Sequence, residues 1–300
     1  MTAKPQPLCC HPTDEAAMEG RSFHRYTAPH QERHVERHMM PGIKLQPTFV
    51  KIWGQDAVPN HPIDKLGKRI GELRFGRPER TNDPLLVKYV YTNPRFAFQT
   101  HPWDLIVQPQ GLAGGRTQSW YILGAEPGAR VGIGTIRPQD SRSLRSAAQN
   151  GVLDQAMDWC PLKAGDFFFI PPGMPHVIGA GISLIGIQHH AGRPDELRMM
   201  PCPTSHREGA IATSPMPAIH RPLGCTGVLL SEGDFGLRLM HMQSGDMIHV
   251  TNAGLAWFIP LRGRGDIDGQ TWRAGECWLL TQARPAIHAA SDADYLFATI

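Results

Sequence analysis

Short apolar segments interrupted by glycine and proline limit this chain to a fold of many strands. Segments such as "LLVKYVYT" (85–92), "SWYILGA" (119–125) and "ARVGIGTI" (129–136) are separated by clusters of Pro, Gly and Asn. The 300 residues include 31 Gly and 27 Pro without any repeat, which favours short strands and turns over long helices. The sequence therefore predicts an all-β protein, built as a sandwich or barrel of antiparallel strands.

Composition and charge exclude several classes of partner. The formal net charge is only +3, with Lys and Arg scattered, so no nucleic-acid surface is expected. No apolar run reaches the roughly 18 residues that span a bilayer, and no membrane partner is expected. The six cysteines have irregular spacings that fit neither a zinc knuckle nor a disulfide framework. We expect a cytoplasmic protein with reduced thiols, and the sequence does not indicate its oligomeric state.

Changes in composition divide the chain into domains. Residues 1–40 contain almost no aliphatic side chains, so we expect a disordered extension there. Prolines and small polar residues displace strand formers over 198–222, which is typical of a linker. The expected domains are therefore 41–197 and 223–300.

A helical insertion is expected within the first domain. The segment 141–159 begins with a candidate N-cap, Ser141, continues with good helix formers and is interrupted at Asn150 and Gly151. This pattern predicts two short helices among the strands.

Three histidine and glutamine side chains are placed by local geometry. In "FAFQTH" (96–101) the period of two sends Gln99 and His101 to the face opposite the phenylalanines. In "FFFIPPGMPH" (167–176) the prolines fix φ and the glycine permits a tight turn, so His176 has little freedom left to lose. Such stiffness suits a preorganised metal ligand, whereas a histidine satisfied in the core is the plainer alternative.

Several ordered motifs resemble a known family. The segment "GDFFFIPPGMPH" fits the spacing G-x5-P-x-G-x2-H that cupin barrels use for their second metal motif. Together with "FVKIWG" (49–54), "IGEL" (70–73), "FQTHPWD" (98–104) and "GGRTQSWYILGAEPGA" (114–129), it makes the chain similar to type I mannose-6-phosphate isomerases over most of residues 45–190.

The resemblance implies a fold of two cupin-type (jelly-roll) β-barrels, of which only the first binds metal. The segment "GQTWRAGECWLL" (269–280) resembles the family's second barrel. The motif positions that follow it are Thr281, Ala283 and Ala286, so the resemblance implies no equivalent metal site there.

The resemblance also implies a zinc site in the first barrel, with one ion per chain. Carried over residue by residue, the ligands are Gln99, His101, Gln118 and His176. Gln118 departs from the family, whose pattern has glutamate before W-Y. Losing that carboxylate removes a negative charge facing the ion, although an amide oxygen can still coordinate, and we expect weaker binding.

The implied reaction moves a proton between C1 and C2 of a sugar phosphate and interconverts mannose 6-phosphate and fructose 6-phosphate. It requires a Lewis acid, groups that shuttle the proton, and cations for the phosphate. Lys88 and Arg116 stand where the family has lysines near the substrate, so both are candidate catalytic and substrate-binding residues. The alternative for each is a solvated surface cation.

Two further departures leave the activity open. Gly186 replaces a glutamate of the family's E-x-Q motif, and a T-Y-R segment that supplies an arginine is missing. His189 and His190 either reach the metal, act as an acid or base pair, or end a strand on the surface. We therefore expect an aldose-ketose isomerase of mannose 6-phosphate or a related sugar phosphate. The alternative is a catalytically impaired or repurposed cupin that binds a sugar phosphate or a metal.

Overall fold

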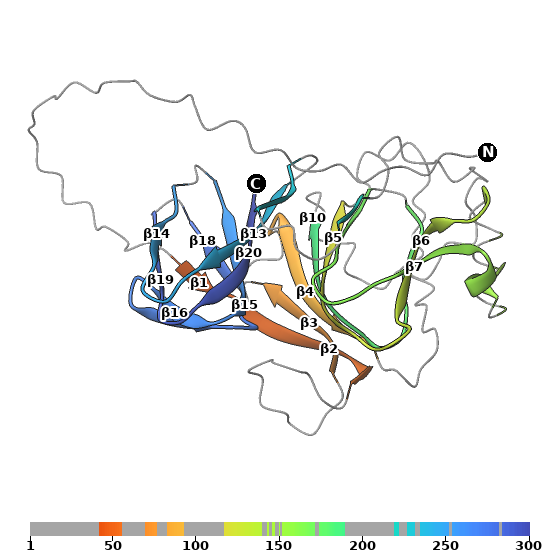
Figure 1. Cartoon of the computed structure of the whole chain (residues 1–300), viewed down its shortest axis with the longest axis horizontal. Helices are drawn as coiled ribbons and strands as arrows, with labels where there is room; N and C mark the ends of the chain where they lie inside the picture. The colour runs from red at the N-terminus through yellow and green to blue at the C-terminus, as the bar shows by residue number, and fades with distance from the viewer. Residues whose placement is uncertain are drawn as a thin grey trace, which may run out of the picture. The chain divides into compact units, whose positions relative to one another are not determined.

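The computed structural model describes the strands and most of their connecting turns. The described residues are 42–55, 70–76, 83–92, 117–139, 143, 146–147, 150, 152–171, 174–189, 219–221, 227–231, 235–251, 254–281 and 284–300. The extension predicted over 1–40 lies outside them. Within them the chain is almost entirely β-structure, so the all-β prediction is confirmed (Figure 1).

Two sheets form the first barrel. The larger has seven strands in the order β11-β8-β5-β10-β4-β3-β2, and the smaller has the order β7-β6-β9. The strands of the larger sheet are β2 (Gln46–Gln55), β3 (Ile70–Gly76), β4 (Leu85–Tyr91), β5 (Gln118–Ala125), β8 (Phe167–Ile170), β10 (Ile182–His189) and β11 (Ile219–Arg221). Those of the smaller sheet are β6 (Arg130–Thr135), β7 (Met157–Pro161) and β9 (His176–Ile178).

Two more sheets form the second barrel. The larger has the order β1-β18-β15-β20-β13-β12, and the smaller has the order β14-β19-β16-β17. The strands of the larger sheet are β1 (Gly42–Lys44), β12 (Gly227–Leu230), β13 (Gly236–Met242), β15 (Ala256–Arg262), β18 (Trp278–Leu280) and β20 (Ala293–Thr299). Those of the smaller sheet are β14 (Met247–His249), β16 (Arg264–Ile267), β17 (Gln270–Arg273) and β19 (Ala286–Ala289).

Each large sheet is buried on both faces because alternate residues enter different cores. In β4, Val87 and Tyr89 pack into one core while Val90 packs into another. The core within the first barrel also contains Trp120 and Ile122. The core between the two large sheets, here called the shared core, joins residues such as Val87 to Trp257 and others of the second barrel. A strand with period-two side chains can serve two cores at once.

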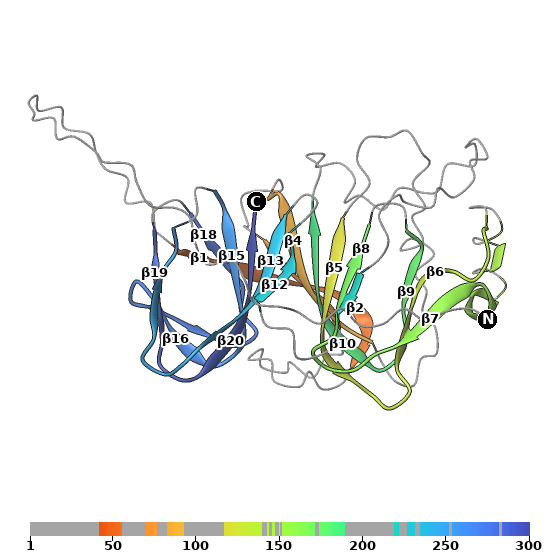
Figure 2. The same cartoon turned by 45° about the horizontal axis from the view of Figure 1, so that its top comes forward.

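Each barrel includes one strand from the part of the chain that mainly forms the other barrel. Strand β1 pairs with β18 of the second barrel, with Ile43 opposite Leu279 (Figure 2). Strand β11 pairs with β8 of the first barrel, with His220 opposite Phe168. The expected first domain, 41–197, therefore begins with a strand of the second barrel, and the expected linker, 198–222, ends with a strand of the first.

The helical insertion is shorter than the sequence predicted. Within 141–159 the described helical residues are Ser143, Ser146 and Ala147. The second predicted helix is present as a short 3-10 helix (Leu153–Gln155), which ends one residue before strand β7 begins. Pairing of β7 with β6 outweighs the helix propensity of the segment, as tertiary context commonly does. Among the described residues, no helix has the length and apolarity that crossing a bilayer requires.

Candidate functional site

The candidate site lies on the face of the seven-stranded sheet that looks into the first barrel, here called the inner face. Cross-strand register places its residues in rows. One row is apolar across its centre, with Val90, Leu184 and Ile122 in the core of the first barrel. The next two rows bring in polar side chains, and the inner face then comprises Glu72, Arg74, Leu86, Lys88, Val90, Gln118, Trp120, Ile122, Phe168, Ile170, Leu184, Gly186 and Gln188.

His176 is held in one tautomer by its own turn. Its Nδ1 lies 2.8 Å from the carbonyl oxygen of Met174. A carbonyl only accepts, so Nδ1 carries the hydrogen and donates it, and in the neutral ring Nε2 is then the unprotonated nitrogen, which can accept a hydrogen bond or bind a metal. This is the arrangement that metal-binding histidines commonly show, with one nitrogen donating to a carbonyl and the other facing the ion.

Gln118 lies beside Nε2 of that ring. Its Nε2 lies 3.4 Å from Nε2 of His176, so the amide can donate to the imidazole. Rotation of the amide by 180° would present its carbonyl oxygen to the same point, since the two ends of an amide are nearly isosteric. The buried side chain of Gln188 lies opposite Gln118 on the neighbouring strand. The first residues of strands β9 and β5 thus bring together two of the four predicted ligands.

An aromatic ring fixes the plane of the imidazole. The ring of Trp120, only 1% exposed, lies 5.3 Å from the His176 ring at an angle of 75°. Edge-to-face contacts of this kind are favourable and directional. Trp120 therefore restrains the His176 ring, and it packs in the same core as the apolar row of Val90, Leu184 and Ile122.

Lys88 reaches across the sheet over a glycine. Lys88 and Gly186 are direct cross-strand partners, and a Cβ built on Gly186 would lie 3.0 Å from Cε and 3.1 Å from Cγ of Lys88. The aliphatic stem therefore occupies the space that a side chain at 186 would need. Gly186, at a position where the resemblance implies a glutamate, thus leaves room for Lys88 to lie along the inner face.

An ion pair on the inner face was missed by the sequence reasoning. Glu72 Oε1 accepts a hydrogen bond of 2.5 Å from Arg74 Nε, and the two side chains are 5% and 32% exposed. A usable signal was present, because two charged residues spaced by two in the otherwise apolar strand "IGELRF" must share one face. Arg74 lies directly opposite Lys88.

The remaining predicted residues divide into two groups. Gln99, His101, Arg116 and His190 lie outside the described residues. His189 is described, and it follows the alternation of Ile185 and Ile187, which pack into the shared core. It therefore points to the face opposite Gln188, away from the candidate metal ligands.

The core of the second barrel is filled by large aromatic side chains. Its core contains Phe258, Trp272, Trp278 and Tyr295, each at most 1% exposed. In the part of the chain that the structure describes, no group of three His, Cys, Asp or Glu side chains is placed to hold a metal.

Comparison with known proteins gives the same assignment as the motifs. The chain is 31% identical to a mannose-6-phosphate isomerase of Streptococcus mutans over 146 residues, 49% of this chain and 46% of that protein. It is 29% identical to the mannose-6-phosphate isomerase ManA of Bacillus subtilis over 119 residues, 39% and 37% of the two chains. The chain resembles mannose-6-phosphate isomerases. The matches span about half or less of the length of these curated relatives, and no family model matches the chain.

Solved structures support the fold. A mannose 6-phosphate isomerase from Bacillus subtilis superposes with a TM-score of 0.58 at 17% identity, covering 87% of this chain and all of that one. A variant of phosphomannose isomerase from Salmonella typhimurium gives a TM-score of 0.51 at 11% identity, covering 86% and 99%. The expected fold of two cupin-type barrels is confirmed.

Proposed function

We propose that this protein is a metal-dependent aldose-ketose isomerase that interconverts mannose 6-phosphate and fructose 6-phosphate, or acts on a related sugar phosphate. The observation that carries the proposal is the placement of Gln118 and Lys88 on the inner face of the first barrel, with His176 of β9 at 3.4 Å from the Gln118 amide. Two of these are predicted metal ligands, and the third is a predicted substrate-binding cation. The resemblance to mannose-6-phosphate isomerases supports the same assignment.

The described side chains fit a divalent metal. His176 presents its unprotonated Nε2, and the Gln118 amide lies beside it. Zinc accepts nitrogen and oxygen ligands of this kind. Gln99 and His101 would complete the set proposed from the sequence. Because every ligand in that set is neutral, the ion would keep more positive charge than beside a carboxylate.

In this proposal the protein side chains orient the sugar and exclude water. Bound zinc supplies the Lewis acid that polarises the sugar carbonyl. Lys88 holds the substrate's oxygens with its ammonium group, whose position is set by the stem lying over Gly186. Trp120 and the apolar row beneath it shield the reacting carbons from solvent. Arg116 is proposed as the second cation.

A non-catalytic role is the second candidate, and the inner face offers a reason for it. Position 186 carries no carboxylate, and position 118 carries an amide. Proton shuttling between C1 and C2 needs a group of suitable pKa within hydrogen-bond reach. A cupin that binds a sugar phosphate or a metal without turnover would need no such group.

A coupled assay on the zinc-loaded full-length protein separates these candidates. We expect fructose 6-phosphate formation from mannose 6-phosphate, with a rate reduced roughly 100-fold or more in Lys88→Met, because a charge facing the substrate is lost. Lys163→Met, at an exposed turn, is the matched control and should keep the wild-type rate. Saturable sugar-phosphate binding without turnover would select the second candidate. Absence of both sugar-phosphate binding and turnover would overturn the isomerase and the sugar-phosphate-binding cupin together.

A further inference from the structure

We infer that Arg74, held by buried Glu72, binds the phosphate group of the substrate beside Lys88. The inference rests on the proposed function and adds the phosphate-recognising residue to it. Arg74 stands outside the four proposed metal ligands and the two cations proposed from the sequence. Arg74 lies on β3. In the sheet, β10 and β4 separate this strand from β5, which carries Gln118.

Register puts the two cations side by side. Arg74 and Lys88 are direct cross-strand partners on one face, so their Cβ atoms are about 4.5–5.5 Å apart. Like charges placed opposite each other in this way destabilise a sheet. Glu72 offsets one of them, and among the described inner-face residues the sum of Glu72, Arg74 and Lys88 is one positive charge. A bound anion would neutralise this excess.

The ion pair leaves the phosphate-binding end of Arg74 available. Glu72 engages Nε, and among the described residues no other carboxylate forms an ion pair with this guanidinium. The two terminal nitrogens form the planar fork that matches two phosphate oxygens. With its side chain 32% exposed, Arg74 is open to a ligand, whereas Glu72 is not.

A comparable pair in the second barrel shows what a purely structural pair looks like. Glu276 is also buried, and it accepts hydrogen bonds from Lys44 Nζ at 2.6 Å, from Arg273 and from the Trp278 indole. Lys44 also lies over the Trp278 ring, 5.9 Å from its centroid. The cross-strand partner of Lys44 is thus an aromatic residue, Trp278. The cross-strand partner of Arg74 is a second cation, Lys88.

The distance along the sheet fits an extended ligand. From β5, which carries Gln118, to β3, which carries Arg74, there are three strand spacings, or about 14 Å at the usual 4.8 Å per spacing. The inward reach of long side chains shortens this span. A sugar phosphate can therefore place its carbonyl end at Gln118 and His176 and its phosphate end at Arg74 and Lys88.

Calorimetric titration of the zinc-loaded full-length protein tests the inference. The titrants are fructose 6-phosphate, fructose and inorganic phosphate. Arg74→Gln should weaken fructose 6-phosphate binding roughly tenfold or more and weaken inorganic phosphate binding as well, since charge-assisted contacts are lost. Fructose binding and zinc content should not change. Lys44→Gln removes a cation from the other buried glutamate and should leave all three titrations at wild-type values.

A second variant protects the test against misfolding. Arg74→Gln removes an ion-pair partner of buried Glu72, which can cost stability. Glu72→Gln/Arg74→Gln replaces both charges of the pair and should show the same loss of phosphate binding. Wild-type affinity for fructose 6-phosphate in both variants would show that the pair is only structural. Failure of the wild-type protein to bind either phosphate compound would overturn the inference too. Phosphate binding that depends on Arg74 but occurs without turnover would overturn the isomerase proposal alone.

Discussion

Gln118 sets the charge at the candidate metal site. Its amide lies 3.4 Å from His176 Nε2, at the position where the family pattern has a carboxylate. We predict that Gln118→Glu binds zinc about tenfold more tightly, because an anionic oxygen replaces a neutral one. Competition with a fluorescent zinc chelator measures this. Gln243→Glu, in a turn of the second barrel, should leave the zinc affinity unchanged. Unchanged or weaker binding in Gln118→Glu would remove Gln118 from the metal shell.

Gly186 controls where Lys88 lies. A Cβ at this position would come within 3.0 Å of the lysine stem, which is flexible and can move aside. We therefore predict that Gly186→Ala keeps or slightly raises the free energy of unfolding, by about 0.5–1 kcal/mol from the loss of glycine freedom. The isomerisation rate should fall by as much as roughly 100-fold as the ammonium shifts. Denaturant unfolding and the coupled assay measure the two effects. A rate equal to that of the wild type would show that Lys88 does not need the space above Gly186 to act in the reaction.

At the residue scale, the sequence predicted the side chains that belong to a recognisable motif. It missed the side chains that come together only through the pairing register of neighbouring strands. His176 was predicted from the stiffness of its turn, and its tautomer follows from the Met174 carbonyl that the same turn supplies. Arg74 was missed because its importance comes from lying opposite Lys88, and pairing of two strands cannot be deduced from either strand alone.

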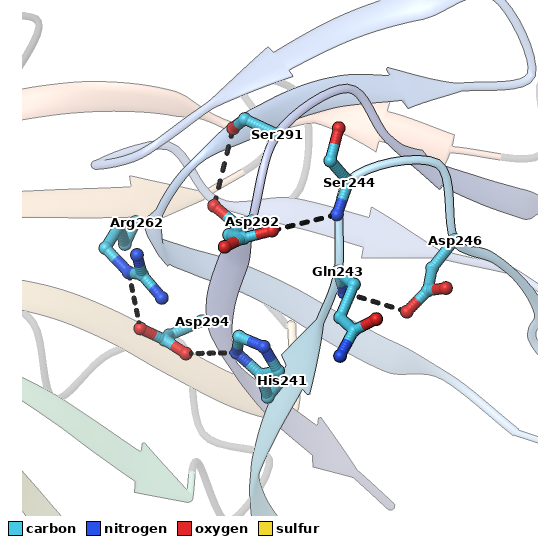
Figure 3. Close-up of polar contacts among 8 residues, drawn as sticks. All are labelled: His241, Gln243, Ser244, Asp246, Arg262, Ser291, Asp292 and Asp294. Carbon is cyan, nitrogen blue, oxygen red and sulfur yellow. Dashed lines mark hydrogen bonds and ion pairs between the residues drawn. The ribbon is translucent and has the colours of Figure 1, made fainter.

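At the scale of the elements, an ion cluster joins three strands of the second barrel. Asp294 of β20 accepts hydrogen bonds from Arg262 of β15 at 2.7 Å and from His241 of β13 at 2.8 Å (Figure 3). Burial opposes ionisation of Asp294, but the contacts with Arg262 and His241 outweigh it and hold its pKa below the usual value. Burial, and then the charge of Asp294, raise the pKa of Tyr121 in the first barrel. The cluster therefore lies close to a strand of the first barrel.

The lowered pKa of Asp294 predicts how stability depends on pH. A depressed carboxyl pKa stabilises the fold above the unfolded-state value of about 4, and this contribution is lost as pH falls through the folded-state value. We predict that Asp294→Asn lowers the melting temperature at pH 7 and that the difference from wild type shrinks below pH 4. Thermal melts across this range measure it. Asp158→Asn, on an exposed side chain of β7, is the control and should change little at either pH. A difference that stays constant with pH would contradict the assignment.

Local propensity explains why the insertion was predicted only in part. The segment "LDQAMDW" contains good helix formers, yet Met157 is fully buried in β7 and Trp159 donates its indole hydrogen to the Asp154 carbonyl. Arg130 of β6 lies over the Trp159 ring, 4.7 Å from its centroid, and pairs with Asp154. These contacts come from a strand more than twenty residues earlier, and periodicity within the segment does not reveal them.

At the scale of the whole molecule, the shared core makes the two barrels depend on each other. Leu73 and Ile185 of the first barrel pack in the same core as Ile259 of the second. The alternation of single strands predicted the all-β class. The use of both faces by each large sheet could not be predicted, because a strand buried on both sides shows a continuous apolar run.

This shared core predicts a single unfolding transition. Ile259→Ala should lower the free energy of unfolding of the whole chain by roughly 2–5 kcal/mol, since it leaves a cavity between the large sheets. Scanning calorimetry should show one transition, shifted as a unit. Val228→Ala, at a position 46% exposed, should cost no more than about 0.5 kcal/mol. Two transitions, of which only one moves, would show that the barrels unfold independently.

The central claim is that His176 and its neighbours hold a divalent metal in the first barrel. Elemental analysis of the full-length protein, after zinc is offered and excess is removed, tests it most directly. We predict one zinc per chain in the wild type, a loss of that ion in His176→Ala, and full retention in His288→Ala. His288 is a histidine of the second barrel whose ring pairs with Asp266. Absence of zinc from the wild type, or equal zinc in wild type and His176→Ala, would contradict the account.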